Sequence, residues 1–213
     1  MFNKMKKLLS VGAVVASAAV LLTGCGGGSQ QAASSSGSAA QEISGKISAS
    51  GSTALLPLLK PAQEAFQDKY EKVTVNVAGG GSFTGMNQVA EGSVQIGNSD
   101  VNLPDEYKDK GLVDHKVVVE PFVFIVDKAN KVDNLTKQQA IDILTGKITN
   151  WKEVGGDDQP ITLIHRAKSS GSRATIADVV LKGASFTDNA VIQDSNGAVR
   201  AAIASTPGSI GYV

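Results

Sequence analysis

A stretch rich in hydroxyl, glycine and arginine residues, at positions 165–175, has the composition of an anion-binding site. Ser170 and Ser172 flank Gly171 and carry hydroxyl groups that can donate hydrogen bonds. Arg166 can form a fork to two oxygen atoms of one anion. Backbone N–H groups in the first turn of a helix add free donors, and the helix dipole favours negative charge there. These residue types predict that the turn captures a small oxyanion.

Two regular elements would position this turn. An apolar run at 161–164 predicts a strand, and the pattern at 174–181 predicts a helix. Hydroxyl-bearing turns also follow strand-like runs at 52–53 and 81–82. One such turn is readily explained as a helix cap, since Ser and Thr are common at that position. Three of them favour binding, because turns at the carboxyl ends of strands line the ligand crevice of an open α/β sheet.

Asp100 follows another strand-like run and has two interpretations. It could be a turn or capping aspartate. Alternatively, it faces the anion, and a carboxylate beside an oxyanion is repulsive unless a proton lies between them. Protonated phosphate has such a proton and fully ionised sulfate does not, so the acid would select for phosphate. Arg166 also has an alternative interpretation, as a surface arginine that forms a salt bridge.

Other chemistries find little support in the sequence. His115 and His165 stand far apart and outside any motif, which favours structural or exposed roles over a metal site. The nucleotide phosphate loop, the nucleophile elbow and the zinc-protease motif are all absent from the sequence. Trp151 is interpreted as a packing residue. No cofactor is expected.

The N-terminal region predicts export and lipid attachment. Residues 1–24 have a lysine-bearing start and a short apolar run, as in a secretory signal. They end in Leu-Thr-Gly before Cys25, the only cysteine in the chain, in a pattern that resembles the bacterial lipobox; an ordinary signal peptide is the alternative. Without residues 1–24 the chain has 17 basic and 20 acidic residues, which argues against a nucleic-acid binder. Residues 25–42 are mostly Gly, Ser, Ala and Gln and predict a flexible tether.

Strand and helix patterns alternate after residue 43, which predicts an α/β fold. The long apolar run at 117–126 is predicted to be buried. The chain stops on entering an apolar strand at 209–213, so we expect a C-terminal part of the fold to lie beyond this sequence. The expected strands are 46–50, 73–77, 94–97, 160–165 and 209–213, and the expected helices are 54–70, 83–91, 136–144, 174–181 and 196–205.

The order of these motifs resembles the phosphate-binding proteins of bacterial phosphate-specific ABC transporters, from about residue 47 to the end. The Thr-Gly-Lys-Ile-Thr-Asn-Trp stretch at 145–151 and the Ser-Asp pair at 99–100 are its most specific parts. The resemblance implies a periplasmic-binding-protein-like fold with a ligand cleft between two lobes. Lys168 departs from the family, in which some members have at that position an acid that pairs with the arginine. The implied phosphate-binding residues are Thr53, Ala54, Ser82, Asp100, Arg166, Ser170, Gly171 and Ser172.

Lobe 1 is expected at 43–126, incomplete without a further C-terminal segment, and lobe 2 at 127–213. The resemblance implies a monomeric receptor without enzymatic activity, anchored by a lipid on Cys25 to the extracytoplasmic face of the cell membrane. It would bind inorganic phosphate and deliver it to the permease subunits of an ABC transporter. The alternatives are a receptor for sulfate, molybdate or tungstate, a secreted phosphatase-like hydrolase, and a surface interaction protein.

Overall fold

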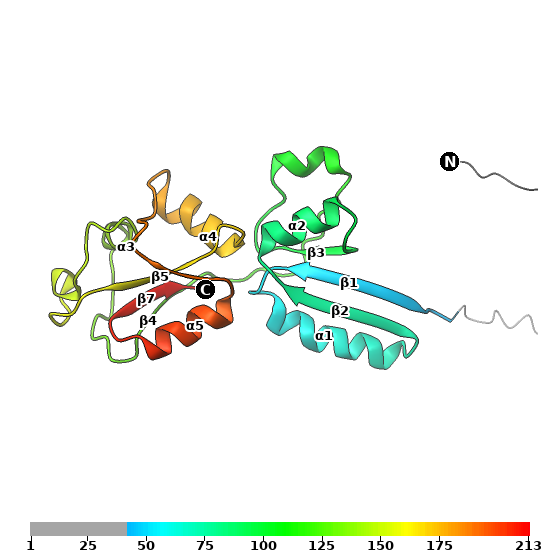
Figure 1. Ribbon diagram of the computed structural model, residues 1–213, viewed down its shortest axis with the longest axis horizontal. Helices are drawn as coiled ribbons and strands as arrows, with labels where there is room; N and C mark the ends of the chain where they lie inside the picture. The colour runs from blue at the N-terminus through cyan, green and yellow to red at the C-terminus, as the bar shows by residue number, and fades with distance from the viewer. Residues whose placement is uncertain (1–41) are drawn as a thin grey trace, which may run out of the picture. The chain divides into compact units, whose positions relative to one another are not determined.

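The computed structural model describes residues 42–213 and contains two β-sheets with helices packed against them (Figure 1). The predicted signal peptide, Cys25 and the tether up to residue 41 lie outside the described residues. The described residues 42–213 belong to one compact unit. The predicted α/β class is confirmed. Within residues 42–213, no helix has the length and apolar character needed to cross a membrane.

The first sheet has three parallel strands in the order β2-β1-β3. Helix α1 connects β1 to β2, and α2 connects β2 to β3, on opposite faces of the sheet (Figure 1). All three strands therefore end at the same edge, where the connecting turns lie. The elements are β1 (Gly45–Gly51), α1 (Leu56–Lys69), β2 (Val73–Gly79), α2 (Ser82–Ala90) and β3 (Ile96–Asn98).

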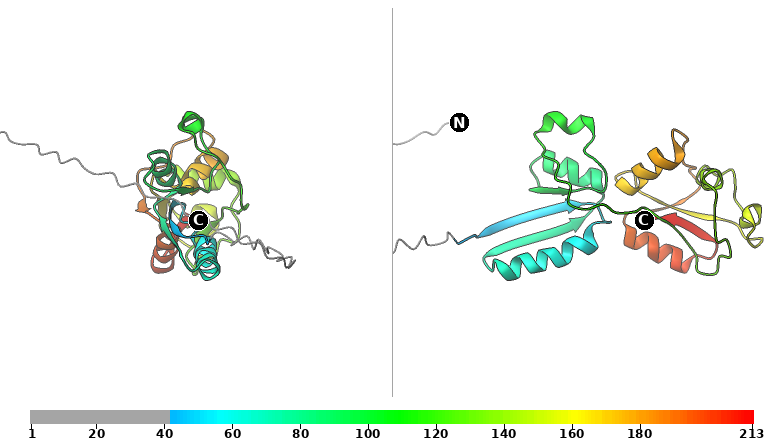
Figure 2. Two further views of the ribbon diagram at one scale, coloured as in Figure 1. Left: turned by 90° about the vertical axis from the view of Figure 1, so that its right-hand side faces the viewer. Right: turned by 180° about the vertical axis from the view of Figure 1, so that it is seen from behind.

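The second sheet has four strands in the order β4-β7-β5-β6. Strand β5 runs parallel to β6 and β7, and β4 runs antiparallel to β7. Helices α4 and α5 lie on opposite faces of this sheet (Figure 2). The elements are β4 (Phe124–Val126), α3 (Lys137–Leu144), β5 (Thr162–Arg166), α4 (Gly171–Ile176), which continues as a π-helical turn (Ala177–Leu181), β6 (Val191–Gln193), α5 (Asn196–Ser205) and β7 (Ser209–Tyr212). Short 3₁₀ helices occupy Asp105–Lys110 and Trp151–Val154.

Strand β4 shifts the boundary expected between the lobes. The sequence placed residues up to 126 in the first lobe, whereas β4 pairs with β7 of the second sheet. In this pairing Phe124 lies opposite Tyr212 and Ile125 lies opposite Gly211, so the second sheet begins before residue 127.

The main hydrophobic core lies in the second sheet and its helices, where Ile143, Leu144 and Ile210 are almost fully buried. Trp151 packs into this core at 2% exposure, and its Nε1 donates a hydrogen bond of 2.8 Å to the carbonyl of Gly208. This agrees with the predicted packing role, because a buried indole N–H needs an acceptor.

The prediction that residues 117–126 form a buried segment is wrong. Val117 is 75% exposed and Val119 is 97% exposed. Phe124–Val126 pairs with β7, and Val123 exchanges two backbone hydrogen bonds of 3.1 Å with Val213, but residues 117–122 belong to no strand or helix. Apolar composition predicted burial, but burial also requires a neighbouring surface, and the sheet begins only at β4.

Candidate anion site at the strand ends

Asp100 joins two of the predicted turns. The hydroxyl of Ser82, at the start of α2, donates a hydrogen bond to Asp100 Oδ1, and the Asp100 backbone N–H donates to Ser82 Oγ over 3.2 Å. The hydroxyl of Ser172, at the start of α4, donates to Asp100 Oδ2 over 2.9 Å. Both serines are fully buried. Residues from β3, α2 and α4 thus converge on one carboxylate.

Gly171 is the reason that α4 can approach Asp100 so closely. A Cβ atom at this position would overlap Asp100 Oδ1 and lie 2.6 Å from Ser82 Oγ. Gly81 has an equivalent role on the opposite side, because its Cβ would overlap the carbonyl oxygen of Ser169. Ser169 in turn accepts a backbone hydrogen bond of 3.1 Å from Phe83. Glycine is therefore required at both turns by space, and at Gly81 also by a φ of 94°.

Arg166 is at the end of β5 and is only 2% exposed. Its Nη1 donates to Asn196 Oδ1, and its Nη2 donates to Thr53 Oγ1 over 3.1 Å and to the Asp194 carbonyl over 3.2 Å. Its Nε has no hydrogen-bond partner among the described residues. Burial lowers the pKa of Arg166, and the charge of Asp100 opposes that effect. The guanidinium remains protonated, as arginine does throughout proteins.

The contacts of Arg166 show which groups hold its side chain, although residue 168 is a lysine and not an acid. The side chain of Lys168 is exposed and takes part in none of the ion pairs found among residues 42–213. Arg166 instead has Asn196 and Thr53 as partners. The surface salt-bridge interpretation of Arg166 is therefore wrong, because the residue is buried and forms no ion pair in the described chain.

Ala54 and Ser170 have local structural contacts. The Ala54 N–H donates to Ser52 Oγ over 3.1 Å. Ser170 Oγ accepts a bond of 3.3 Å from the backbone N–H of Arg173 and so caps α4. The predicted residues thus form two contact groups. Ser82, Asp100 and Ser172 meet beside Gly171, and Thr53 bonds to Arg166, while Ala54 and Ser170 support the turns.

Asn196 was missed in the sequence although a signal was present. The run Asp194-Ser195-Asn196 follows a strand-like segment and precedes a predicted helix, as the three recognised turns do. It is a fourth turn of the same kind, and it supplies two partners of Arg166.

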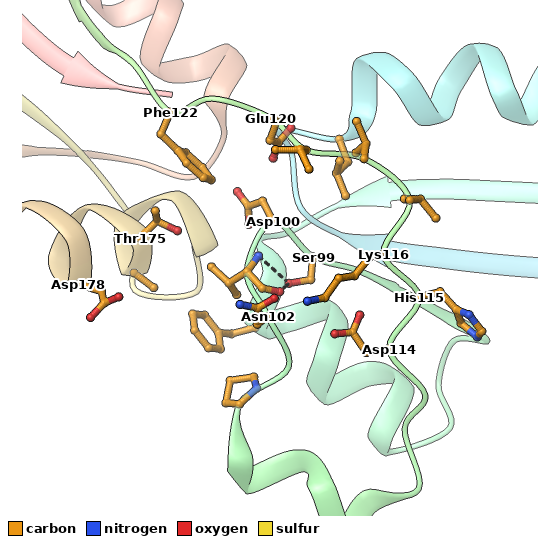
Figure 3. A pocket seen from close by; sticks show the side chains of 18 of the residues that line it. Ser99, Asp100, Asn102, Asp114, His115, Lys116, Glu120, Phe122, Thr175 and Asp178 are labelled. Atoms are coloured by element: carbon orange, nitrogen blue, oxygen red, sulfur yellow. Dashed lines mark hydrogen bonds between the residues drawn. The ribbon is translucent and has the colours of Figure 1, made fainter.

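A cavity of about 680 Å³ lies beside Asp100, and Figure 3 shows that Glu120 and Phe122 also line it. Burial raises the pKa of Glu120, and the nearby charge of Asp100 raises it further. Glu120 Oε1 is buried without a hydrogen-bond partner in the described chain. The wall of the cavity near Asp100 therefore disfavours additional negative charge.

The two histidines lie away from these contacts. His165 is 1% exposed, and its ring packs edge-on against Phe186 with 4.5 Å between centroids. Burial lowers its pKa to about 4, and the charge of Arg173 acts in the same direction. His115 is exposed on the loop that lines the cavity (Figure 3). Within residues 42–213, no group of His, Cys, Asp and Glu side chains has the arrangement of a metal site.

Comparison with known proteins gives consistent matches. The PBP superfamily domain matches residues 32–213. The phosphate-binding protein PstS of Bacillus subtilis is 43% identical over 175 residues, which are 81% of this chain and 58% of that protein. PstS of Borreliella burgdorferi is 31% identical, over 78% of this chain and 62% of that protein. The chain thus spans about three fifths of the length of these two relatives.

Solved structures agree with the sequence comparison. A putative phosphate ABC transporter substrate-binding protein from Clostridium perfringens, solved with bound phosphate, is 35% identical with a TM-score of 0.76. The alignment covers 79% of this chain and 70% of that one. An ABC-type phosphate transport receptor from Vibrio cholerae is 26% identical with a TM-score of 0.60, over 78% of this chain and 70% of that one.

Proposed function

The chain belongs to the PBP superfamily and, within it, to the bacterial phosphate-binding proteins, and from this premise we propose that it is a receptor for inorganic phosphate. The proposal extends to delivery of the ion to the permease subunits of an ABC transporter. The receptor acts as a monomer and performs no catalysis. Steady turnover of a phosphomonoester by the purified chain would contradict the last point.

The observation that carries the proposal is the convergence of complementary groups on Asp100. Ser82 and Ser172 supply hydroxyl donors, and the charge of Asp100 acts on the buried guanidinium of Arg166. A phosphate ion at this point accepts hydrogen bonds from the hydroxyls and the guanidinium and donates its own proton to Asp100. The carboxylate thus contributes to binding only if the anion is protonated.

Asp100 also distinguishes phosphate from the other tetrahedral oxyanions considered. Fully ionised sulfate has no proton to donate, so Asp100 and sulfate would repel each other at short range. The site therefore favours phosphate over sulfate, molybdate and tungstate.

The test is equilibrium titration of the full-length chain with phosphate and with sulfate, between about pH 5 and about pH 8. Phosphate should bind more tightly than sulfate, and Asp100→Asn should reduce that preference at least about tenfold, because an amide can donate to an unprotonated oxyanion. Asp188→Asn makes the same charge change at an exposed position and should leave the preference unchanged. Equal affinity of the unaltered chain for both ions would refute the phosphate assignment.

Attachment to the extracytoplasmic face of the membrane is the remaining part of the proposal. It rests on the lipobox-like residues before Cys25 and on the Gly- and Ser-rich stretch that follows. A lipid on Cys25 with a tether would hold the receptor near its permease while leaving it free to bind phosphate.

A further inference from the structure

Asn196 connects the buried arginine to the turn after β1. Its side-chain Oδ1 accepts the hydrogen bond from Arg166 Nη1. Its backbone N–H donates to Thr53 Oγ1 over 3.1 Å, and Thr53 Oγ1 also accepts from Arg166 Nη2. Three residues from distant parts of the chain thus form a closed set of contacts. Asn196 is held in place by its own helix, whose first turn is capped by Ser195.

The acceptors around Arg166 are all electrically neutral. They are the amide oxygen of Asn196, the hydroxyl of Thr53 and the backbone carbonyl of Asp194. The carboxylates of Asp100 and Asp194 influence the pKa of Arg166, but among residues 42–213 neither forms an ion pair with it. The hydrogen bonds therefore orient the guanidinium through neutral acceptors, while the two carboxylates act on its charge without forming an ion pair with it.

We infer that Asn196 is the positioning residue for Arg166. Because its side chain is uncharged, it also sets which charge state of the anion the site binds best. This inference rests on the proposed phosphate-binding function. Asn196 fixes the direction of Nη1 and leaves the positive charge of the buried guanidinium for the bound anion. A carboxylate in the same place would satisfy the same hydrogen bond and also compensate the charge. The protein would then hold its arginine as firmly but attract the anion less.

The decisive variant is Asn196→Asp, which keeps the size and the acceptor and adds one negative charge. Phosphate affinity should fall at least about tenfold at neutral pH. The loss should be larger near pH 8 than near pH 5, because the added charge repels the dianion of phosphate more than the monoanion. A purely structural role for Asn196 would not change the pH profile in this way.

Asn196→Ala provides a second measurement that does not depend on the added charge. It removes the acceptor of Arg166 Nη1 and should weaken phosphate binding about tenfold, with the pH profile of the unaltered chain retained. Asn189→Asp is the matched control, because Asn189 is exposed in the same part of the chain and its side chain makes no hydrogen bond among the described residues. It should bind phosphate as the unaltered chain does.

The experiment is calorimetric titration of the full-length chain and these variants with inorganic phosphate at several pH values, with thermal unfolding as a check of folding. If the unaltered chain binds no phosphate, the proposed function fails, and this inference fails with it. If the unaltered chain binds and Asn196→Asp keeps its affinity and pH profile, the inference alone is overturned. If Asn196→Asp does not fold, unchanged affinity in Asn196→Ala overturns it.

Discussion

The buried histidine of β5 makes the stability of the chain depend on pH. His165 is 1% exposed, and neither ring nitrogen has a hydrogen-bond partner in the described chain. Its ring packs against both Phe186 and Tyr212, and the guanidinium of Arg173 lies over the Phe186 ring, 4.4 Å from its centroid. A proton on His165 would therefore be buried, unpaired and close to another positive charge.

The magnitude follows from the change in pKa. Burial, helped by Arg173, lowers the pKa of His165 from 6.5 to about 4 in the folded protein. Between these values the unfolded chain binds a proton that the folded chain does not, so the contribution of His165 to stability is complete above about pH 6.5 and is lost as the pH falls toward about 4. A difference of this size corresponds to about 3 kcal/mol of unfolding free energy.

The assay is urea unfolding of the full-length chain and of His165→Gln at several pH values between about 4 and about 7.5. Glutamine does not titrate, so the variant should lose about 3 kcal/mol less than the unaltered chain on acidification, whatever its stability at neutral pH. His115→Gln is the matched control, since His115 is exposed, and it should follow the unaltered chain. Parallel pH profiles for the unaltered chain and His165→Gln would refute the reasoning.

Two further changes test the turns and the anchor. Gly171→Ala would force a Cβ against Asp100 and Ser82 and should weaken phosphate binding at least about tenfold; titration should show no such loss for Gly197→Ala, where the nearest atom is 3.8 Å away. Cys25→Ala should release the chain from the membrane fraction and abolish labelling by a fatty-acid analogue, and retention of either in the variant would contradict lipid attachment.

Much of the fold could be predicted because local signals define it. The helix expected at 196–205 is observed as Asn196–Ser205, and the one expected at 136–144 begins after Thr136, whose hydroxyl accepts from the backbone N–H of Gln139. Caps and apolar periodicity depend on residues three or four positions apart. The error at 117–126 has a different origin, since exposure there depends on whether another element lies against the segment.

For the candidate site, too, the sequence predicts some features and not others. Thr53, Ser82, Asp100 and Arg166 could be selected from their types and their places after strands, but their contacts could not. The partner of Arg166 is Asn196, 30 residues further along the chain, and Thr53 reaches the same arginine over 113 residues. Such pairs are set by strand order and register.

The sequence by itself determined which turns carry hydroxyl, glycine and charged groups, because those turns are built from neighbouring residues. The tertiary structure alone decided which of these turns meet. The order β2-β1-β3 brings the end of β3, with Asp100, beside the starts of α1 and α2, and the order β4-β7-β5-β6 places Arg166 next to the turn that carries Asn196. A small difference in strand pairing would leave every turn intact and separate the groups, because side-chain contacts across a sheet depend on register.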